Sequence, residues 1–231
     1  MQATTAILQE VKEEAVIVER RTGFGRFVQT PQSRGTDINW HHGVVSAHVR
    51  ERLLRQRPAT LWLTGLSGAG KSTLAYALEK ILLDRGHCCF VVDGDNLRHH
   101  LNSDLGFSAH DRRENIRRAA EVAHLLNEAG IIVITAFISP FRDDRAMAKE
   151  IIGVERFIEV HVSTPGVVCE RRDPKGLYAK ARRGEIPEFT GVSAPYEAPD
   201  DPDMEINSEL HTIEDAADKL YRHLIGLCYL K

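Results

Sequence analysis

The sequence contains few cysteines and no apolar run long enough to cross a membrane. Four of its 231 residues are cysteines. Cys88 and Cys89 fall in an apolar stretch, and Cys169 and Cys228 are isolated. This usage is typical of reduced, packed thiols and argues against a disulfide framework or a zinc site. The first residues include charged side chains and lack the apolar core of a signal peptide, so we expect a cytoplasmic protein without membrane association.

The chain also lacks a strong charge of either sign. Its formal net charge is −3, so the chain as a whole is not a binder of polyanions, and we expect no nucleic-acid partner. Any basic binding site must be local. Because 42% of the residues are hydrophobic, the chain can bury one substantial core. Its length allows one large domain or a domain with an extension.

What the sequence does contain is a complete phosphate-binding loop. Residues 61–74, LWLTGLSGAGKSTL, match the pattern G-x-x-x-x-G-K-[ST], with an apolar strand pattern before it and a helical pattern after it. Glycines let backbone N–H groups approach a polyphosphate, and a helix N-terminus stabilises the anion. We expect Lys71 to reach the β- and γ-phosphates of ATP and Ser72 to bind Mg²⁺. The alternative is a glycine-rich turn with an incidental lysine.

Two carboxylates follow the next apolar stretch. Residues 88–92 have the pattern of a strand buried on both faces of a parallel sheet, and Asp93-Gly94-Asp95 comes directly after them. The carboxyl ends of strands are where open α/β sheets bind ligands, so one aspartate can hold Mg²⁺ or accept a proton from a substrate hydroxyl. We assign Asp93 to the metal and both aspartates to catalysis. The alternative is an ordinary Asp-Gly turn.

A long helix is predicted after residue 108. Ser108 and Asp111 form a capping-box pattern, and the helical periodicity continues to Ala129. The residues expected on its buried face are Ile116, Ala120, Ala123, Leu125 and Leu126.

Arginines gather around the start of this helix. Arg98 and Arg112 lie near its N-terminal end, together with Asn115. A helix N-terminus and arginines both stabilise anions, so we expect an anion site there. The alternative is a solvated charged face, which is our interpretation of Arg113 and Arg118.

The rest of the chain predicts three more strands, at residues 131–138, 156–162 and 203–207. Thr164 and Pro165 predict a helix with Thr164 as its N-cap and proline in its first position.

The stretch from 171 to 191 is too basic and polar for a core helix, so we interpret it as a lid that excludes water and supplies cations to the transferred phosphoryl group. The final helix is predicted to begin after Thr212, which forms a capping pattern with Asp215.

Strands that alternate with helices, with the phosphate loop directly after the first strand, predict a three-layer parallel α/β domain of the P-loop nucleoside triphosphate hydrolase type from residue 37 to the end. Residues 1–36 bury little apolar area, and we interpret them as a loosely ordered arm or linker. The segment NWHHG, with Trp40, His41 and His42, admits a metal-binding or stacking role. We prefer an aromatic anchor that docks the arm.

Six separated motifs together resemble those of the adenylyl-sulfate kinase family. They are NWHHG, GLSGAGKST, VVDGDNLR, LGFS followed by RRENIRR, FISPFR, and DPKGLYAKARRGEIPEFTG, and they extend from about residue 36 to the end. The resemblance implies an enzyme of sulfate assimilation that uses MgATP to phosphorylate the 3′-hydroxyl of adenosine 5′-phosphosulfate. It also implies a homodimer, and association or fusion with a sulfate adenylyltransferase in relatives.

The resemblance implies two binding sites. The ATP site comprises Gly65, Leu66, Ser67, Gly68, Ala69, Gly70, Lys71, Ser72, Thr73 and, from the lid, Arg171. The adenylyl-sulfate site comprises Asp95, Arg98, Phe107, Arg112, Asn115, Ile138, Ser139, Lys175, Leu177 and Phe189. Adenine is a flat ring that Phe107 and Phe189 can sandwich, and the phosphosulfate is an anion suited to Arg98 and Arg112.

The resemblance carries two incompatible roles for Ser139. One is a phosphoserine intermediate, for which a serine needs an activating base. The other is a hydrogen bond to the substrate during direct in-line transfer, which needs no covalent step. We expect the second role, because residues 135–142 contain no His, Asp, Glu or Lys.

Two other functions are compatible with a phosphate loop. One is a kinase of another small molecule, such as a sugar acid or a nucleoside monophosphate. The pair Phe107 and Phe189 disfavours a small non-aromatic substrate. The other is a catalytically silent ATP-binding module, which the presence of Lys71, Ser72 and the two aspartates disfavours.

Overall fold

The computed structural model describes residues 41, 43–227 and 229–230. The chain divides into two units, residues 1–42 and residues 43–231. The arm predicted at residues 1–36, its boundary with the kinase domain, and Trp40 and His42 of the NWHHG segment therefore lie outside the described residues. No helix among the residues described is long and apolar enough to cross a membrane.

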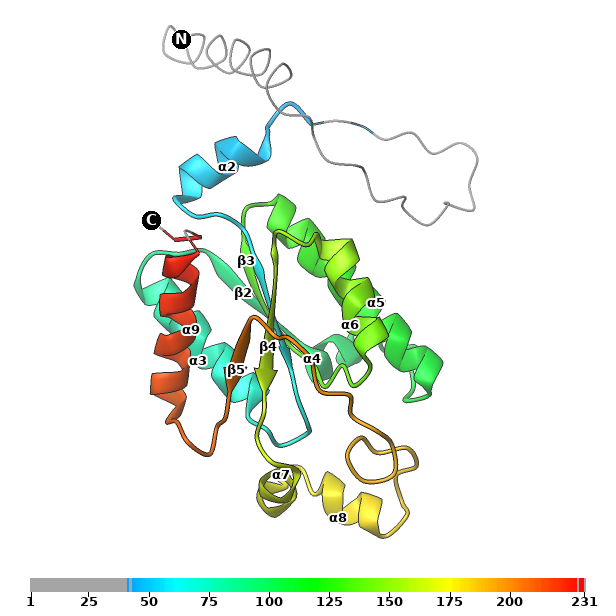
Figure 1. The fold of residues 1–231 in the computed structure, drawn as a ribbon. Helices are drawn as coiled ribbons and strands as arrows, with labels where there is room; N and C mark the ends of the chain where they lie inside the picture. Colours follow the sequence, from blue (N-terminus) through cyan, green and yellow to red (C-terminus); the bar gives the residue numbers. More distant parts are fainter. Residues whose placement is uncertain (1–40, 42, 228, 231) are drawn as a thin grey trace, which may run out of the picture. The chain divides into compact units, whose positions relative to one another are not determined.

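One parallel sheet lies at the centre of the second unit (Figure 1). Its strands are β1 (Thr60–Thr64), β2 (Cys89–Asp93), β3 (Ile132–Ala136), β4 (Phe157–Val162) and β5 (Met204–Ile206). The spatial order is β2-β3-β1-β4-β5, and all neighbours are parallel. The strand that precedes the phosphate loop is therefore the central strand of the sheet.

Helices cover both faces of this sheet, which confirms the three-layer α/β fold. The helices are α2 (Ala47–Leu54), α3 (Lys71–Asp84), α4 (Gly94–His99), α5 (Ala109–Glu128), α6 (Arg142–Ile152), α7 (Gly166–Arg172), α8 (Leu177–Arg182) and α9 (Ile213–Gly226). In Figure 1, α3 and α9 lie on one side of the sheet and α5 and α6 on the other, while α7 and α8 lie beyond the strand ends.

The alternation of β1 side chains divides the core in two. All five residues of β1 are buried. Leu61 and Leu63 belong to the cluster that includes α3 and α9, and Trp62 belongs to the cluster that includes α5 and α6. The Trp62 ring stacks on Phe137 and Phe157, with ring centroids 5.4 Å and 5.7 Å apart. Burial of both faces explains why β1 contains no charged residue.

Two helix starts follow the predicted capping chemistry. Ser108 is the N-cap of α5, and its hydroxyl accepts a hydrogen bond from the Asp111 amide. Thr212 caps α9 in the same way through Asp215. Helix α7 differs from the prediction by one position, because Pro165 is its N-cap and the helix begins at Gly166.

Two predictions of burial are wrong. Strand β2 is not buried on both faces, because it lies at the edge of the sheet, where Phe90 is 55% exposed. Leu125 was expected on the buried face of α5 but is 67% exposed. Leu125 follows Ile116 by nine residues, which places the two side chains on opposite sides of a helix with 3.6 residues per turn.

Two short helices were not predicted. Helix α4 begins at Gly94, inside the stretch considered as a turn, and Asp93 caps it. Helix α8 lies within the basic lid segment, and it buries Tyr178 and Ala181. The lid is therefore anchored to the core by a few apolar residues in spite of its polar composition.

Candidate active site

The phosphate loop joins β1 to α3 in a conformation that requires glycine. Gly65 has a φ of +150°, and a Cβ there would lie 2.5 Å from the Val162 carbonyl oxygen. Gly68 has a φ of +76°, and its Cβ would lie 2.9 Å from the Cys169 carbonyl oxygen. Both obstacles are backbone atoms, so they cannot move aside cheaply. The loop therefore runs in direct contact with the end of β4 and the middle of α7.

Hydrogen bonds from distant segments fix the shape of this loop. The Ala69 carbonyl accepts from the hydroxyl groups of Thr164 and Ser208, at 3.0 Å and 2.9 Å. The Tyr178 hydroxyl, on α8, donates to the Ser67 carbonyl at 3.0 Å. Because protein donors satisfy these carbonyls, the protein itself fixes the shape of the loop.

Lys71 is buried at the first position of α3. Its ammonium donates to the carbonyl oxygens of Gly65 and Leu66, at 2.9 Å and 2.7 Å. Burial lowers the pKa of Lys71 from 10.5 to about 8, because the charged form loses hydration. A bound phosphate would give the Lys71 ammonium an anionic partner in addition to these neutral carbonyl oxygens.

Ser72 and Asp93 form a pair of oxygen ligands. The Ser72 hydroxyl donates to Asp93 Oδ2 at 2.6 Å. Asp93 Oδ1 accepts from the amides of Asp95 and Asn96, at 2.9 Å and 3.4 Å, so α4 fixes the orientation of the carboxylate. A hydroxyl and a carboxylate fit Mg²⁺, which usually takes one or two protein ligands and completes its shell with phosphate and water. The described residues contain no cluster of three or more His, Cys, Asp or Glu able to hold a metal by themselves.

Asp95 has a different partner from Asp93. Its carboxylate forms an ion pair with Lys175, which comes from the lid segment. Both side chains are more than half exposed, so the pair can exchange with a bound substrate. The structure thus brings together two residues that the sequence assigned to the same substrate.

Arg98 and Arg112 converge on the segment that contains Phe107. Arg98 donates to the carbonyl oxygens of Leu105 and Gly106 and lies over the Phe107 ring, 4.5 Å from its centroid. Arg112 donates to the Phe107 carbonyl at 2.8 Å. Burial lowers the pKa of both arginines, and for Arg98 the nearby charge of Arg112 adds to the effect. Two like charges at close range favour an anion between them.

Arg112 also reaches the lid. Its guanidinium donates to the Glu188 carbonyl at 2.7 Å and to the Thr190 hydroxyl at 2.8 Å. These bonds connect the N-terminal end of α5 to the last part of the lid segment. Arg113, which points elsewhere, forms an ion pair with Asp144.

The two aromatic residues assigned to adenine differ in availability. Phe107 is 66% exposed. Phe189 is buried and packs edge-on against Tyr178, with ring centroids 5.0 Å apart. Phe107 therefore presents an accessible ring, whereas Phe189 is part of the contact between lid and core.

Asn115, Ile138 and Ser139 lie deeper in the structure. Asn115 is buried, and its side-chain oxygen accepts a hydrogen bond from Asn102 at 2.9 Å. The Ile138 carbonyl accepts from the Thr64 hydroxyl at 2.8 Å. Ser139 is 2% exposed, and its hydroxyl accepts a hydrogen bond from the Trp62 indole at 3.2 Å. Within residues 43–227, no carboxylate or imidazole is hydrogen-bonded to that hydroxyl.

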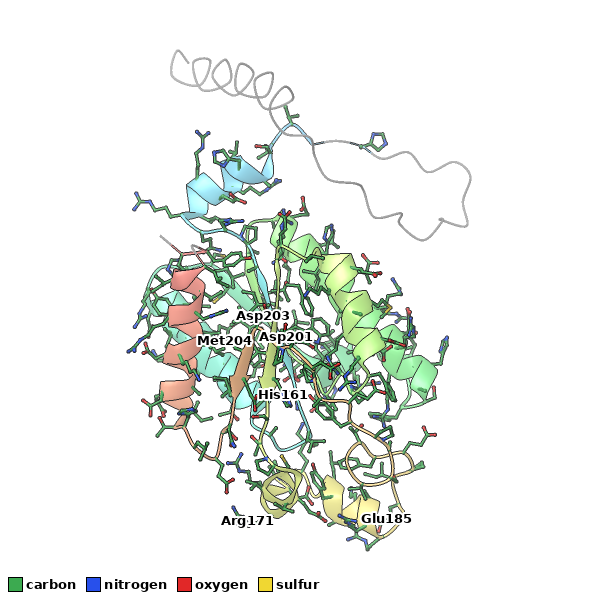
Figure 2. The ribbon with its side chains drawn as sticks, viewed as in Figure 1. His161, Arg171, Glu185, Asp201, Asp203 and Met204 are labelled. Carbon is green, nitrogen blue, oxygen red and sulfur yellow. The ribbon has the colours of Figure 1, made fainter. Side chains whose placement is uncertain are left out.

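Leu177 and Arg171, the other two residues assigned from the lid, are less buried than Phe189. Leu177 is partly buried against the core. Arg171 is 75% exposed and lies 3.9 Å from Glu209; Figure 2 shows it on α7, at the same end of the molecule as Glu185. Its neighbour Arg172 donates to the Ser208 hydroxyl, the group that also bonds the phosphate loop. No described contact joins Arg171 to the loop.

The sequence did not predict the role of several residues that shape the site. They are Asn102, Thr64, Tyr178, Ser208 and Arg145, each of which bonds an assigned residue or the loop. Thr64 and Tyr178 lie inside the phosphate-loop and lid stretches, but the role of each of these residues depends on a contact that only the folded chain makes.

These observations define a class of protein. A parallel sheet with a phosphate loop after its central strand, an oriented hydroxyl and carboxylate suited to Mg²⁺, and a basic lid segment make up a P-loop phosphotransferase.

Comparison with known proteins identifies the family within this class. The family model described as adenylylsulphate kinase matches residues 57–207. The adenylyl-sulfate kinase of Clostridium kluyveri is 50% identical over 187 residues, which cover 81% of this chain and 94% of that protein. The solved structure of the Mycobacterium tuberculosis APS kinase CysC in complex with AMPPNP and APS is 47% identical, with a TM-score of 0.70, and the match covers 74% of this chain and 99% of that chain. The protein belongs to the adenylyl-sulfate kinase family.

The family domain also occurs in a longer protein. The bifunctional enzyme NodQ of Rhizobium tropici is 55% identical over 181 residues, which cover 78% of this chain but 29% of NodQ. Most of NodQ therefore has no counterpart in this chain.

Proposed function

We propose that the protein transfers the γ-phosphoryl group of MgATP to the 3′-hydroxyl of adenosine 5′-phosphosulfate, giving 3′-phosphoadenosine 5′-phosphosulfate and ADP in sulfate assimilation. The observation that carries the proposal is the presence of two anion-binding surfaces joined by one short helix. The phosphate loop with Lys71 is the first surface, and Arg98 with Arg112 is the second. Helix α4 connects them, since it begins at the carboxylate that bonds Ser72 and contains Arg98.

Different residues of the chain bind the phosphates and the metal ion during the transfer. The phosphate-loop amides and Lys71 bind the ATP phosphates and stabilise negative charge on the leaving group. Ser72 and Asp93 would hold Mg²⁺, which neutralises phosphate charge. The described residues fit this ion because their two oxygens are already 2.6 Å apart and oriented by α4.

Asp95 is the better candidate to accept the proton of the 3′-hydroxyl. Both oxygens of Asp93 have protein donors, from Ser72 on one side and from α4 on the other. Among the described residues, the Asp95 carboxylate is bonded only to Lys175, and this pair is largely exposed. A substrate hydroxyl that binds here would replace Lys175 as the partner of the Asp95 carboxylate.

Direct transfer between the two substrates is the mechanism that the site supports best. The Ser139 hydroxyl is buried against the Trp62 indole and has no base among its described hydrogen-bond partners. A serine nucleophile needs such a base. In the direct mechanism the Ser139 hydroxyl donates a hydrogen bond to the bound adenylyl sulfate and forms no covalent bond.

The substrate is tested with a coupled assay of ADP release. Adenosine 5′-phosphosulfate, gluconate, shikimate and AMP are compared at equal concentration. We expect turnover with adenosine 5′-phosphosulfate and at most a few per cent of that rate with the others. Preference for gluconate, shikimate or AMP would assign the chain to another small-molecule kinase. Saturable ATP binding without turnover on any of the four would favour the silent module.

The assembly and location of the protein stay predictions. We propose a homodimer and a cytoplasmic location, and we propose that residues 1–36 form an arm outside the kinase domain of residues 37–231. Sedimentation velocity of the full chain tests the dimer. A sedimentation coefficient of a monomer, or of a larger assembly, would contradict it.

A further inference from the structure

The backbone of Ser139 has a conformation that its neighbours must hold in place. Its φ is +37°, in the left-handed region that residues other than glycine rarely adopt. Pro140 follows, and a residue before proline is normally restricted to extended conformations. Such a conformation persists only where the surrounding contacts determine it.

Three side chains supply these contacts. The Trp62 indole donates to the Ser139 hydroxyl at 3.2 Å. The Thr64 hydroxyl lies 3.4 Å from the Ser139 carbonyl oxygen. Arg145 donates to the same carbonyl at 2.7 Å, which is the shortest of the three distances and the only bond made by a charged group.

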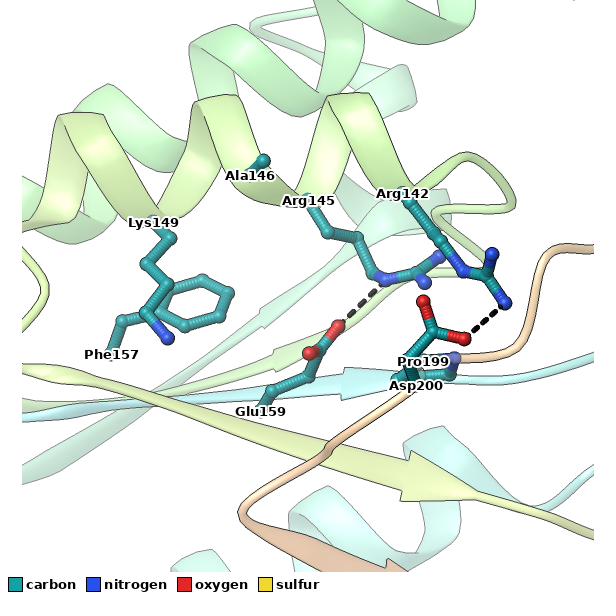
Figure 3. Close-up of a pocket in the computed structure, with 8 residues that line it drawn as sticks. All are labelled: Arg142, Arg145, Ala146, Lys149, Phe157, Glu159, Pro199 and Asp200. Carbon is teal, nitrogen blue, oxygen red and sulfur yellow. Dashed lines mark hydrogen bonds and ion pairs between the residues drawn. The ribbon is translucent and has the colours of Figure 1, made fainter.

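Arg145 is itself fixed from two other directions. It is 3% exposed on α6, and its Nε donates to Glu159 on β4 at 2.7 Å (Figure 3). Its Nη2 donates to the Glu197 carbonyl at 2.8 Å. The planar guanidinium therefore joins α6, β4 and the segment before β5 to the backbone of Ser139.

We propose that Arg145 is a positioning residue for the phosphoryl transfer, holding the Ser139 carbonyl so that the Ser139 hydroxyl stays at the substrate site. The proposal rests on the proposed function, in which Ser139 bonds the adenylyl sulfate. Arg145 acts through Ser139, because its side chain is 3% exposed and its Nε, Nη1 and Nη2 atoms each have a protein acceptor. Its effect should fall on the adenylyl-sulfate site and leave the phosphate loop unchanged.

Two variants remove the guanidinium in different ways. Arg145→Lys keeps a positive charge for Glu159, but a lysine ammonium cannot span the three acceptors of the planar fork. The double variant Arg145→Met with Glu159→Gln removes the charge and its partner together, which avoids an unpaired, partly buried carboxylate. Lys149→Met is the matched control. Lys149 lies one turn further along α6, lines the same cavity of about 190 Å³, and contacts the Phe157 ring rather than Ser139.

The first measurement is steady-state kinetics. For both Arg145 variants we expect kcat/KM for adenosine 5′-phosphosulfate to fall about thirtyfold or more, with KM for ATP within about twofold of the wild type. The fall should persist in Arg145→Lys, since charge alone does not restore the geometry. Lys149→Met should stay within about twofold of the wild type in every parameter.

The second measurement is independent of activity. The chain has two tryptophans, so a Trp40→Phe background leaves only the indole that bonds Ser139. In the ligand-free protein, the indole N–H resonance of Trp62 should shift in both Arg145 variants and stay in place in Lys149→Met.

The outcomes separate this proposal from the proposed function. Folded Arg145 variants with kinetics within about threefold of the wild type and an unmoved Trp62 resonance would overturn the positioning role. A wild-type protein that is inactive on adenosine 5′-phosphosulfate would overturn the proposed function and the role of Arg145 in it. The Trp62 resonance would still show whether Arg145 holds Ser139.

Discussion

Lys71 holds its proton less tightly in its buried site than in water, and this predicts a pH dependence of ATP binding. Its pKa is lowered to about 8 by burial. Phosphate favours the charged lysine, so binding should take up protons at pH 8 to 9, and Kd for ATP should rise as the pH rises above 8. Titration calorimetry in buffers of different ionisation enthalpy measures the uptake.

Lys71→Met is the control for this titration, because it removes the titrating group. Its residual ATP binding should show no proton uptake between pH 8 and 9. Equal uptake in wild type and Lys71→Met would assign the protons to another group.

Arg112 and Arg113 are neighbours on α5 with different surroundings, which makes them a matched pair. Arg112→Ala removes a charge next to Arg98 and Phe107 and should raise KM for adenosine 5′-phosphosulfate about tenfold to a hundredfold, because a charge-assisted bond is lost. Arg113→Ala breaks an ion pair with Asp144 and should leave that KM nearly unchanged. Steady-state kinetics with each substrate varied in turn measures both. If Arg112→Ala affected ATP and adenosine 5′-phosphosulfate equally, the anion site would lie elsewhere.

Ser139→Ala distinguishes direct from covalent transfer. We expect turnover to continue with a loss of about 1 to 3 kcal/mol, as for a missing hydrogen bond to a charged or polar group. Transfer from chiral thiophosphate-labelled ATP should invert the configuration at phosphorus. Retention, together with a phosphorylated Ser139 peptide formed and consumed at the rate of turnover, would establish the covalent route.

The residues of the site were only partly predictable from the sequence. The residue types and spacing around Lys71 and Asp93 have a direct chemical meaning, so they predict the phosphate-binding and metal-binding groups before any fold is known. Arg145 could not be found in this way. It lies in the charged run of residues 142–145, and only the packing of α6 against β4 buries it.

At the scale of elements, helix α8 contributes more to the structure of the phosphate loop than its polar composition predicts. Tyr178 lies on α8, and its hydroxyl donates to the Ser67 carbonyl of the phosphate loop. Burial raises the pKa of Tyr178 to about 12, so the hydroxyl remains a donor at any physiological pH. Tyr178→Phe should raise KM for ATP by about fivefold, as expected for a lost hydrogen bond of about 1 kcal/mol.

Tyr76→Phe is the comparison for this variant. Tyr76 is on α3, is 44% exposed, and its hydroxyl accepts a bond from Asn96 rather than bonding the loop. It should leave KM for ATP within about twofold of the wild type. Similar kinetics for the two variants would show that the contact from α8 does not support the loop.

The sequence predicted the starts of helices better than the burial of individual side chains. The hydroxyl caps at Ser108 and Thr212 depend on residues three positions away, so the sequence contains the whole interaction. The exposure of Phe90 depends on β2 being an edge strand. That position is a property of strand order, which no short stretch of sequence contains.

At the scale of the whole molecule, the strand order places the residues assigned to both substrates at one edge of the sheet. Strand β1 lies between β3 and β4, and the groups assigned to ATP follow β1 while those assigned to the acceptor follow β2 and β3. In parallel sheets these ends share one edge, and ligands bind there. The alternation of strands and helices predicted this edge from sequence, although it did not predict the order of the strands.

The Ala69 carbonyl bonds hydroxyl groups that lie 95 and 139 residues further along the chain. The ribosome makes Thr164 and Ser208 long after the phosphate loop itself, and a contact of such sequence separation forms only when both segments are present. A nascent chain that ends before β5 therefore has the complete loop sequence and Thr164 but lacks Ser208, the second hydroxyl group bonded to the Ala69 carbonyl. We therefore expect the loop to gain its full set of hydrogen bonds, and with it full affinity for ATP, only after the residues that follow β5 have been made.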